Sequence, residues 1–257
     1  MSRIGIFVYG VLCYALCLVA LVYSIGFIGG FFTPTTLDGL AQRPLHTALT
    51  IDVALLVAFA LQHSIMARPA FKRWWTGIVP AAAERSTYVL ASSIAVGALF
   101  AFWEPIGGVV WQTEGAVRTA VTGLYLFGWA LLLYVTFLID HFDLFGLKQV
   151  WRALIGKEYR PPQFYTPSLY KLVRHPLYIG WLTIFWAAPT MTVSHLVFAL
   201  VTTAYILFAI RLEERDLVAA FGTDYVAYRA RTPMLVPGVP RPSRPKRPAE
   251  ESGAELM

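Results

Sequence analysis

The chain has 257 residues, of which 57% are hydrophobic and only 14% are charged. This balance excludes an ordinary soluble globule and predicts a membrane protein. The net charge of +6 does not by itself indicate a nucleic-acid partner, because the distribution of the cations along the chain matters more than their sum.

Apolar runs long enough to cross a membrane follow one another along the chain. A transmembrane helix needs about 20 predominantly apolar residues, because the hydrocarbon core is about 30 Å thick. We place such runs at 5–31, 47–67, 86–106, 119–140, a shorter 177–189, and 193–212. The sequence therefore predicts an all-α, polytopic membrane helical bundle with five to six transmembrane helices.

The first run follows Arg3 but does not read as a signal peptide, because it is too long and lacks a clear small-residue cleavage site. We therefore expect a retained first span. Cys13 and Cys17 lie four residues apart on one face of this span. They are expected to pack as small hydrophobes, with no disulfide framework and no metal site.

Lysines and arginines alternate in density between successive connections. Four fall in 67–86, six in 141–175 and eight from 211 onward, whereas the intervening connections carry only Arg43 and Arg118. This is the positive-inside pattern, and it predicts six crossings with both termini in the cytoplasm. Membrane orientation thus accounts for the basicity without a nucleic-acid partner.

The connection 141–175 is the longest polar one and is rich in aromatic residues. Long loops that carry such residues tend to be functional, so we expect this segment to fold back over the cytoplasmic mouth. Residues 238–257 are dense in proline and charge and are expected to form a disordered tail. Residues 1–237 are expected to form one integral-membrane domain, with 141–237 as its cofactor-binding part.

The short run 177–189 is followed almost at once by the run that begins at Val193, which predicts a tight antiparallel helical hairpin. The start of the first arm then lies beside the end of the second arm at the cytoplasmic face. Such a hairpin brings together residues far apart in sequence: Arg174, His175 and Tyr178 with Arg211, Glu213 and Glu214.

The hairpin mouth offers both signs of charge. Pro176 suits the first turn of a helix, whose free amides, together with Arg174 and His175, favour an anionic group. Glu213 and Glu214 are placed to receive an ammonium or sulfonium charge. A pocket with a positive and a negative end is one interpretation, and a solvated helix end with local ion pairs is the other.

Two separated motifs, 174-RHPLYIGW-181 and 213-EERDLVAAFGTDYVAYRARTPMLVP-237, together resemble the C-terminal signature of the isoprenylcysteine carboxyl methyltransferase and phospholipid methyltransferase superfamily. The resemblance implies S-adenosylmethionine as cofactor, bound in a cytoplasmic pocket at the C-terminal hairpin. The cofactor-binding residues that it implies are Tyr170, Arg174, His175, Pro176, Tyr178, Gly180, Arg211, Glu213, Glu214 and Tyr225. The chain has Ser168-Leu169-Tyr170 where the superfamily often has Gly-Pro-Tyr.

Three further stretches, 62-QHSIMARPAFKRWW-75, 84-ERSTYVL-90 and 140-DHFDLFGLKQVW-151, are similar to bacterial methanethiol S-methyltransferases. This resemblance implies conversion of methanethiol to dimethyl sulfide, with hydrogen sulfide, other small thiols and selenols as further substrates. The alternatives are methylation of a lipid or isoprenylcysteine, or a non-catalytic NnrU-like membrane protein. The expected partners are a small thiol and membrane lipid, with no obligatory protein partner.

A thiol must lose its proton before it attacks a methyl group, because the thiolate is the nucleophile. His63 and His141 lie at the cytoplasmic level of the predicted topology and are candidate bases. Asp140 is expected to contact His63 across the bundle and completes the catalytic set. Structural hydrogen bonding is the alternative for both histidines, and His46 and His195 are expected to play no catalytic part.

Overall fold

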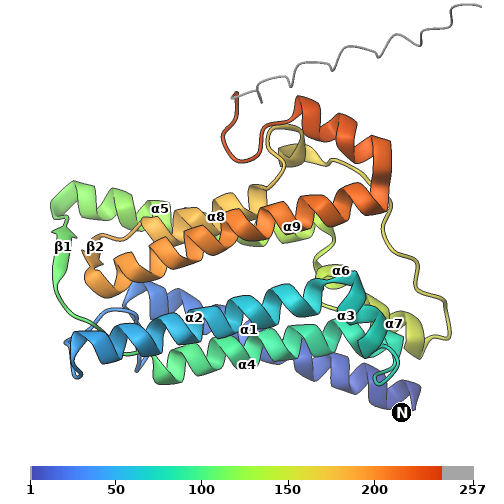
Figure 1. Cartoon of the computed structure of the whole chain (residues 1–257), viewed down its shortest axis with the longest axis horizontal. Coiled ribbons are helices and arrows are strands. Elements are labelled where there is room, and N and C mark those ends of the chain that lie inside the picture. The colour runs from blue at the N-terminus through green and yellow to red at the C-terminus, as the bar shows by residue number, and fades with distance from the viewer. Residues whose placement is uncertain (1, 239–257) are drawn as a thin grey trace, which may run out of the picture.

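The computed structural model describes residues 2–238 and consists almost wholly of helices (Figure 1). In chain order its elements are α1 Arg3–Gly29, α2 Leu45–Ala67, α3 Pro69–Trp75, η1 Ala81–Ala83, α4 Glu84–Phe102, β1 Val109–Gln112, α5 Gly115–Ile139, α6 His141–Leu144, α7 Leu147–Leu154, η2 Ser168–Lys171, α8 Pro176–Trp186, β2 Thr190–Thr192 and α9 Val193–Arg231. The expected tail lies, from residue 239, outside the described residues.

Five of these helices, α1, α2, α4, α5 and α9, are long and apolar enough to cross a membrane. Their outer surfaces carry large exposed apolar side chains such as Val19, Leu124 and Phe137. An apolar outer face is what a helix needs when lipid surrounds it. The prediction of an all-α polytopic membrane bundle is therefore confirmed.

The helices form two layers (Figure 1): α5, α8 and α9 lie together over α1, α2 and α4. The chain enters α1, leaves α2 and begins α8 at the same end of the bundle, which we call the site end. The opposite end, where β1 and β2 pair, is the far end. The main core runs between the layers and is built from aromatic and branched residues such as Phe27, Trp129, Ile184 and Phe198.

Helix α8 is short, with 11 residues, and it packs tightly on α5. A β-carbon added to Gly180 would lie 3.3 Å from the backbone of Leu132, and one added to Gly128 would lie 2.9 Å from a side-chain carbon of Ile184. Small residues at such contacts allow membrane helices to approach closely. The absence of a Cβ atom at both positions therefore allows α8 to pack closely against α5, which is a full-length span.

At about 1.5 Å per residue, α8 extends only about 16 Å and does not cross a bilayer alone. The chain continues in an extended form through β2, which pairs antiparallel with β1 so that Thr190 lies opposite Gln112. Helix α9 then returns toward the site end. The predicted hairpin is confirmed, and its turn lies at the far end.

The far end is tied together by a buried histidine. His195 Nε2 lies 3.1 Å from the carbonyl oxygen of Phe185, and Nδ1 lies 3.4 Å from Oδ2 of Asp38. The hydroxyl of Thr192, which caps α9, donates to the same carboxylate. This cluster links the α1–α2 connection to the turn of the hairpin.

Helix α9 turns back on itself at Gly222, where φ is +55° and ψ is −127°. A positive φ of this kind is strained for a residue with a side chain, so glycine is required here. Beyond Gly222 the helix folds back toward the segment that enters α8, as the red end of the ribbon shows in Figure 1. The sequence predicted a span over 193–212, and the observed helix continues well past it.

Candidate active site

The hairpin brings the two charged motifs together at the site end. Nε of Arg174 lies 2.7 Å from Oε1 of Glu214, and Nε2 of His175 lies 3.2 Å from the same oxygen. The hydroxyl of Tyr178 donates to Oε2 of Glu213 across 3.0 Å. The predicted meeting of these five residues is confirmed.

Arg174 is almost fully buried, with 3% of its surface exposed. Besides Glu214, its guanidinium donates to two backbone carbonyls, of Arg229 across 3.2 Å and of Thr232. Both carbonyls lie at the C-terminal end of α9, where a positive charge is favoured by the helix dipole. A buried guanidinium needs acceptors of this kind, because an unpaired buried charge is costly.

The backbone at the entry to α8 is paired as well. The amide of Arg174 donates to the carbonyl of Pro233 across 2.9 Å, and the amide of His175 donates to the carbonyl of Met234 across 3.2 Å. Pro176 then opens α8 at its first turn, as predicted. The chain that follows α9 thus lies alongside the chain that precedes α8.

Arg174 and His175 do not form the free positive end of a pocket, and Glu214 does not form a free negative end. Arg174 and Glu214 neutralise each other, and His175 is buried against the same carboxylate. Glu213 is the more accessible acid, with 43% of its side chain exposed. The negative group that faces outward is therefore Glu213.

A hollow of about 360 Å³ lies beside this cluster, between the two halves of α9. Its lining residues are Arg211, Glu214, Arg215, Val218 and Arg229. Three guanidinium groups around one carboxylate give the hollow a positive character, which suits a ligand carboxylate. The turn at Gly222 brings Arg229 here from the end of the helix.

Sequence reasoning found Arg211 but missed Arg215, Val218 and Arg229. The spacing of four between Arg211 and Arg215 was a visible signal, because such residues share one face of a helix. No spacing rule indicates Arg229, because its position depends on the backbone turn at Gly222.

The tyrosines near this hollow sit in an aromatic cluster. The ring of Phe164, from the long connection, packs at 5.3 to 5.9 Å from the rings of Phe221, Tyr225 and Tyr228. The hydroxyl of Tyr228 donates to the carbonyl of Tyr170 across 2.6 Å. The expectation that the connection folds back onto the site end is therefore met by these contacts.

The hydroxyl groups of Tyr225 and Tyr170 are both available to hydrogen-bond a ligand. Tyr225 is buried, and its hydroxyl has no hydrogen-bond partner among the described residues. Burial, with a smaller contribution from the charge of Glu213, raises the pKa of Tyr170. Tyr170 is therefore a neutral hydrogen-bond donor at physiological pH.

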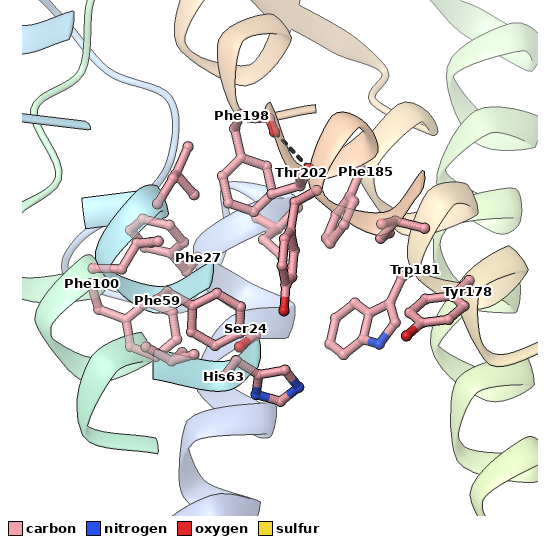
Figure 2. A pocket seen from close by; sticks show the side chains of 16 residues that line it. Ser24, Phe27, Phe59, His63, Phe100, Tyr178, Trp181, Phe185, Phe198 and Thr202 are labelled. Carbon is pink, nitrogen blue, oxygen red and sulfur yellow. Dashed lines mark hydrogen bonds between the residues drawn. The ribbon is translucent and has the colours of Figure 1, made fainter. Parts of the chain in front are cut away.

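A second, apolar pocket of about 200 Å³ lies between the two helix layers (Figure 2). It is lined by Ser24, Phe27, Ile28, Leu56, Phe59, His63, Val96, Leu99, Phe100, Tyr178, Trp181, Phe185, Phe198, Thr202, Tyr205 and Ile206. Tyr178 belongs to this lining and also bonds to Glu213. One phenol therefore connects the apolar pocket with the charged cluster.

His63 lies at one end of the apolar pocket, and Phe198 lies at the other (Figure 2). Its Nε2 is 2.8 Å from the hydroxyl of Tyr88, and its Nδ1 is 3.1 Å from Oγ of Ser92. The ring also stacks on Phe59 at 5.2 Å. A hydroxyl can donate or accept, so both the neutral and the protonated imidazole can keep these contacts.

Asp140 and His141 form a different cluster, at the end of α5. Asp140 pairs with Lys148 and caps the short helix α6 by accepting from the amide of Asp143. His141 Nε2 lies 2.7 Å from the hydroxyl of Tyr14, and its ring stacks on Phe137 at 4.4 Å. Burial lowers the pKa of His141.

The expected contact between Asp140 and His63 is wrong. The carboxylate of Asp140 is taken by Lys148, and His63 is held by Tyr88 and Ser92. Helix α5 ends at Ile139, and Asp140 has a left-handed backbone conformation with φ +91°. The side chain of Asp140 therefore does not continue the helical face of α5. Gly180, one of the expected cofactor residues, lies in the contact between α8 and α5 described above.

Within residues 2–238 no group of three or more His, Cys, Asp or Glu side chains could hold a metal ion. The two cysteines of α1 are free thiols, with Cys13 buried.

Comparison with known proteins identifies close relatives over nearly the whole chain. It is 52% identical over 244 residues to a methanethiol S-methyltransferase of Crocosphaera subtropica, covering 95% of this chain and 96% of the relative. It is 46% identical over 238 residues to the methanethiol S-methyltransferase of Mycobacterium tuberculosis, covering 92% and 98%. Nurim of Rattus norvegicus is 31% identical over 194 residues, covering 70% and 72%. No family model and no solved structure matches the chain.

Proposed function

The chain belongs to the family of methanethiol S-methyltransferases, and we propose that it converts methanethiol to dimethyl sulfide with S-adenosylmethionine as methyl donor. The observation that supports this most directly is the shared residue Tyr178, which joins an apolar pocket to a charged cluster. Methyl transfer between a charged donor and a small apolar thiol requires two such sites side by side.

The residues at the site end fit the methyl donor. The donor supplies an electrophilic methyl group on a sulfonium, together with an amino-acid carboxylate and ammonium. The three arginines of the hollow suit the carboxylate. The outward carboxylate of Glu213 suits a cationic group. The buried hydroxyl of Tyr225 has no hydrogen-bond partner within residues 2–238, and a ligand atom would provide one.

Arg174 acts indirectly in this proposal. It holds Glu214 in place, and through its bonds to Arg229 and Thr232 it holds the returning end of α9 over the hollow. His175 and Pro176 fix the start of α8, and Gly180 fixes α8 against α5. These residues position the donor site without needing to touch the reacting atoms.

The thiol is placed in the apolar pocket with its sulfur toward His63. An alkyl thiol is largely protonated at neutral pH, because its pKa is no lower than the value of about 8.5 of cysteine. His63 accepts the thiol proton at Nε2, where the thiol replaces the contact with Tyr88, and Ser92 holds the imidazole through Nδ1. The surrounding aromatic rings exclude water from the nucleophile.

Asp140 and His141 have a positioning role in this scheme. Their partners, Lys148 and Tyr14, come from α7 and α1. They therefore hold the end of α5 against α7 and α1, at the point where the long connection to the donor site begins.

The protein is an integral membrane protein, and we propose the bacterial inner membrane as its location. The cations of 67–86, 141–175 and the end of α9 gather at the site end. This arrangement supports a cytoplasmic site end, where the methyl donor is available. The similarity to methyltransferases over almost the full length favours the thiol enzyme over a lipid methyltransferase and over a non-catalytic protein.

The test is a product assay with the purified full chain in detergent. With S-adenosylmethionine and methanethiol we expect dimethyl sulfide in the headspace, and with either reactant left out we expect none. Calorimetry should detect saturable binding of S-adenosylhomocysteine. A protein that binds no S-adenosylhomocysteine and releases no dimethyl sulfide would contradict the proposal.

A further inference from the structure

The apolar pocket is larger than methanethiol requires. Methanethiol has two non-hydrogen atoms, whereas the pocket encloses about 200 Å³. An engineered apolar cavity of about 150 Å³ in another protein is large enough to bind benzene. The space beyond a bound methanethiol therefore has room for a six-membered ring.

The lining of the pocket is chemically suited to an aromatic ring. Six of the lining residues present phenyl or indole rings: Phe27, Phe59, Phe100, Phe185, Phe198 and Trp181. Aromatic rings pack favourably against one another in offset or edge-to-face arrangements. The pocket is thus matched to an aromatic guest in surface as well as in size.

Four hydroxyl groups of the lining already form hydrogen bonds within the protein. The hydroxyls of Ser24 and Thr202 donate to carbonyls of their own helices, those of Ala20 and Phe198. The phenol of Tyr205 bonds to Ser64, and that of Tyr178 bonds to Glu213. None of these four hydroxyl groups requires a polar ligand, so an apolar guest leaves their hydrogen bonds intact.

His63 gives the pocket a direction. It lies at the end opposite Phe198, so a thiol with its sulfur at His63 extends its organic group toward the aromatic rings (Figure 2). Leu56 stands seven residues before His63 on the same helix, which is two turns or about 10 Å toward the far end. Leu56 therefore lines the pocket beyond the organic group of a thiol whose sulfur is at His63.

We propose that the enzyme also methylates apolar thiols with an organic group of about the size of benzene, and that benzenethiol is such a substrate. The inference rests on the proposed function, since it assigns the thiol to the same pocket and uses the same donor. A carbon–sulfur bond forms between the methyl group and the thiol sulfur, and the bond between that methyl group and the sulfonium breaks. The thiol proton passes to His63 and then to solvent, and the products are methyl phenyl sulfide and S-adenosylhomocysteine.

The first experiment compares two substrates in three proteins. We expect the wild type to methylate benzenethiol, with methyl phenyl sulfide as product. Leu56→Phe fills the space two turns from His63, so we expect the ratio of kcat/KM for benzenethiol to that for methanethiol to fall about tenfold, an effect typical of overpacking. Leu61→Phe makes the same change at an exposed position of the same helix and should leave the ratio unchanged.

The second experiment needs no turnover. Methyl phenyl sulfide, titrated into the wild-type protein without methyl donor, should change the intrinsic tryptophan fluorescence in a saturable manner, because Trp181 lines the pocket. Leu56→Phe should weaken this binding. Retained binding of S-adenosylhomocysteine by Leu56→Phe would show that the variant is folded.

The outcomes separate the two proposals. If methanethiol is methylated but benzenethiol is not, or if Leu56→Phe and Leu61→Phe have the same ratio, the inference is overturned and the proposed function stands. If neither thiol is methylated, the proposed function is contradicted. If methyl phenyl sulfide shows no saturable binding, the apolar pocket does not bind an aromatic ligand, and the inference is overturned.

Discussion

The two ends of the α8–α9 hairpin each hold a buried histidine beside a carboxylate. At the site end His175 lies 3.2 Å from Glu214, and at the far end His195 lies 3.4 Å from Asp38. At the far end the remaining partners are the cap of α9 and a helix carbonyl. At the site end the pair borders a hollow lined by arginines.

The comparison teaches that residue types alone do not define a functional site. The far-end pair links the α1–α2 connection to the turn of the hairpin. The site-end pair includes Glu214, which lines the hollow between the two halves of α9. Variants at the two ends should therefore differ in their effect on binding, even where the substituted residues are of the same type.

The largest effect is expected from Arg174→Met. It removes the guanidinium and leaves Glu214 buried without its main counter-charge, which typically costs about 3–5 kcal/mol of stability. Arg43→Met at the far end is the matched change, because Arg43 is 54% exposed and forms one ion pair with Glu104. That pair should contribute at most about 1 kcal/mol. Thermal unfolding in detergent and S-adenosylhomocysteine binding measure the difference, and equal losses at both ends would refute it.

A histidine change comes next. His63→Gln keeps a polar side chain but loses the base, so kcat for methanethiol should fall about 100-fold or more, in the range typical of general-base catalysis. The loss should be smaller for benzenethiol, since arenethiols ionise more readily. His195→Gln at the far end should leave the ratio of the two rates unchanged. Equal losses for both thiols in His63→Gln would argue against proton transfer to this residue.

A smaller effect is expected from Tyr178→Phe. The variant loses the hydrogen bond to Glu213 that joins the two sites, and a hydrogen bond to a charged group contributes about 1.5–3 kcal/mol. We expect kcat/KM for methanethiol to fall by a factor of about 10 or more. The control is Tyr23→Phe in α1, whose hydroxyl bonds to Thr35 of the α1–α2 connection across 2.7 Å. An unchanged kcat/KM in Tyr178→Phe would show that this hydrogen bond does not couple the two sites.

The smallest effect is expected from Lys148→Met. The hydrogen bond with Asp140 raises the pKa of Lys148, and 37% of the Lys148 side chain is exposed, so the pair should contribute about 1 kcal/mol or less. Because the folded-state pKa is raised, this contribution is complete below the ordinary lysine pKa of about 10.4 and is lost as the pH rises through the folded value. The free energies of unfolding of the wild type and the variant should therefore converge once the pH exceeds the folded-state pKa of Lys148. A large loss of methanethiol turnover at neutral pH would contradict a positioning role for Asp140.

Much of the fold could be predicted from sequence because it depends on local signals. Run lengths located the spans, and the short run before Val193 together with Pro176 predicted the hairpin and the meeting of Arg174 with Glu214. These features follow from helix geometry and the thickness of a bilayer.

The remaining features depend on contacts between elements. The pairing of Arg174 with Glu214 closes the cluster that sequence reasoning pictured as open. Asp140 faces Lys148 because of a left-handed residue at the end of α5. The aromatic pocket draws residues from five helices, α1, α2, α4, α8 and α9, so no window of the sequence displays it.

The backbone pairing of Arg174 and His175 with Pro233 and Met234 has a consequence for the order of synthesis. The ribosome makes the chain from the N-terminus, so all five long helices precede the residues that complete the proposed donor site. Until residues 232–234 have been added, the guanidinium of Arg174 lacks the carbonyl of Thr232. The bundle can therefore be inserted in the membrane before the proposed donor site has formed, and a chain that stops short of Thr232 would be an inserted protein in which Arg174 lacks one of its acceptors.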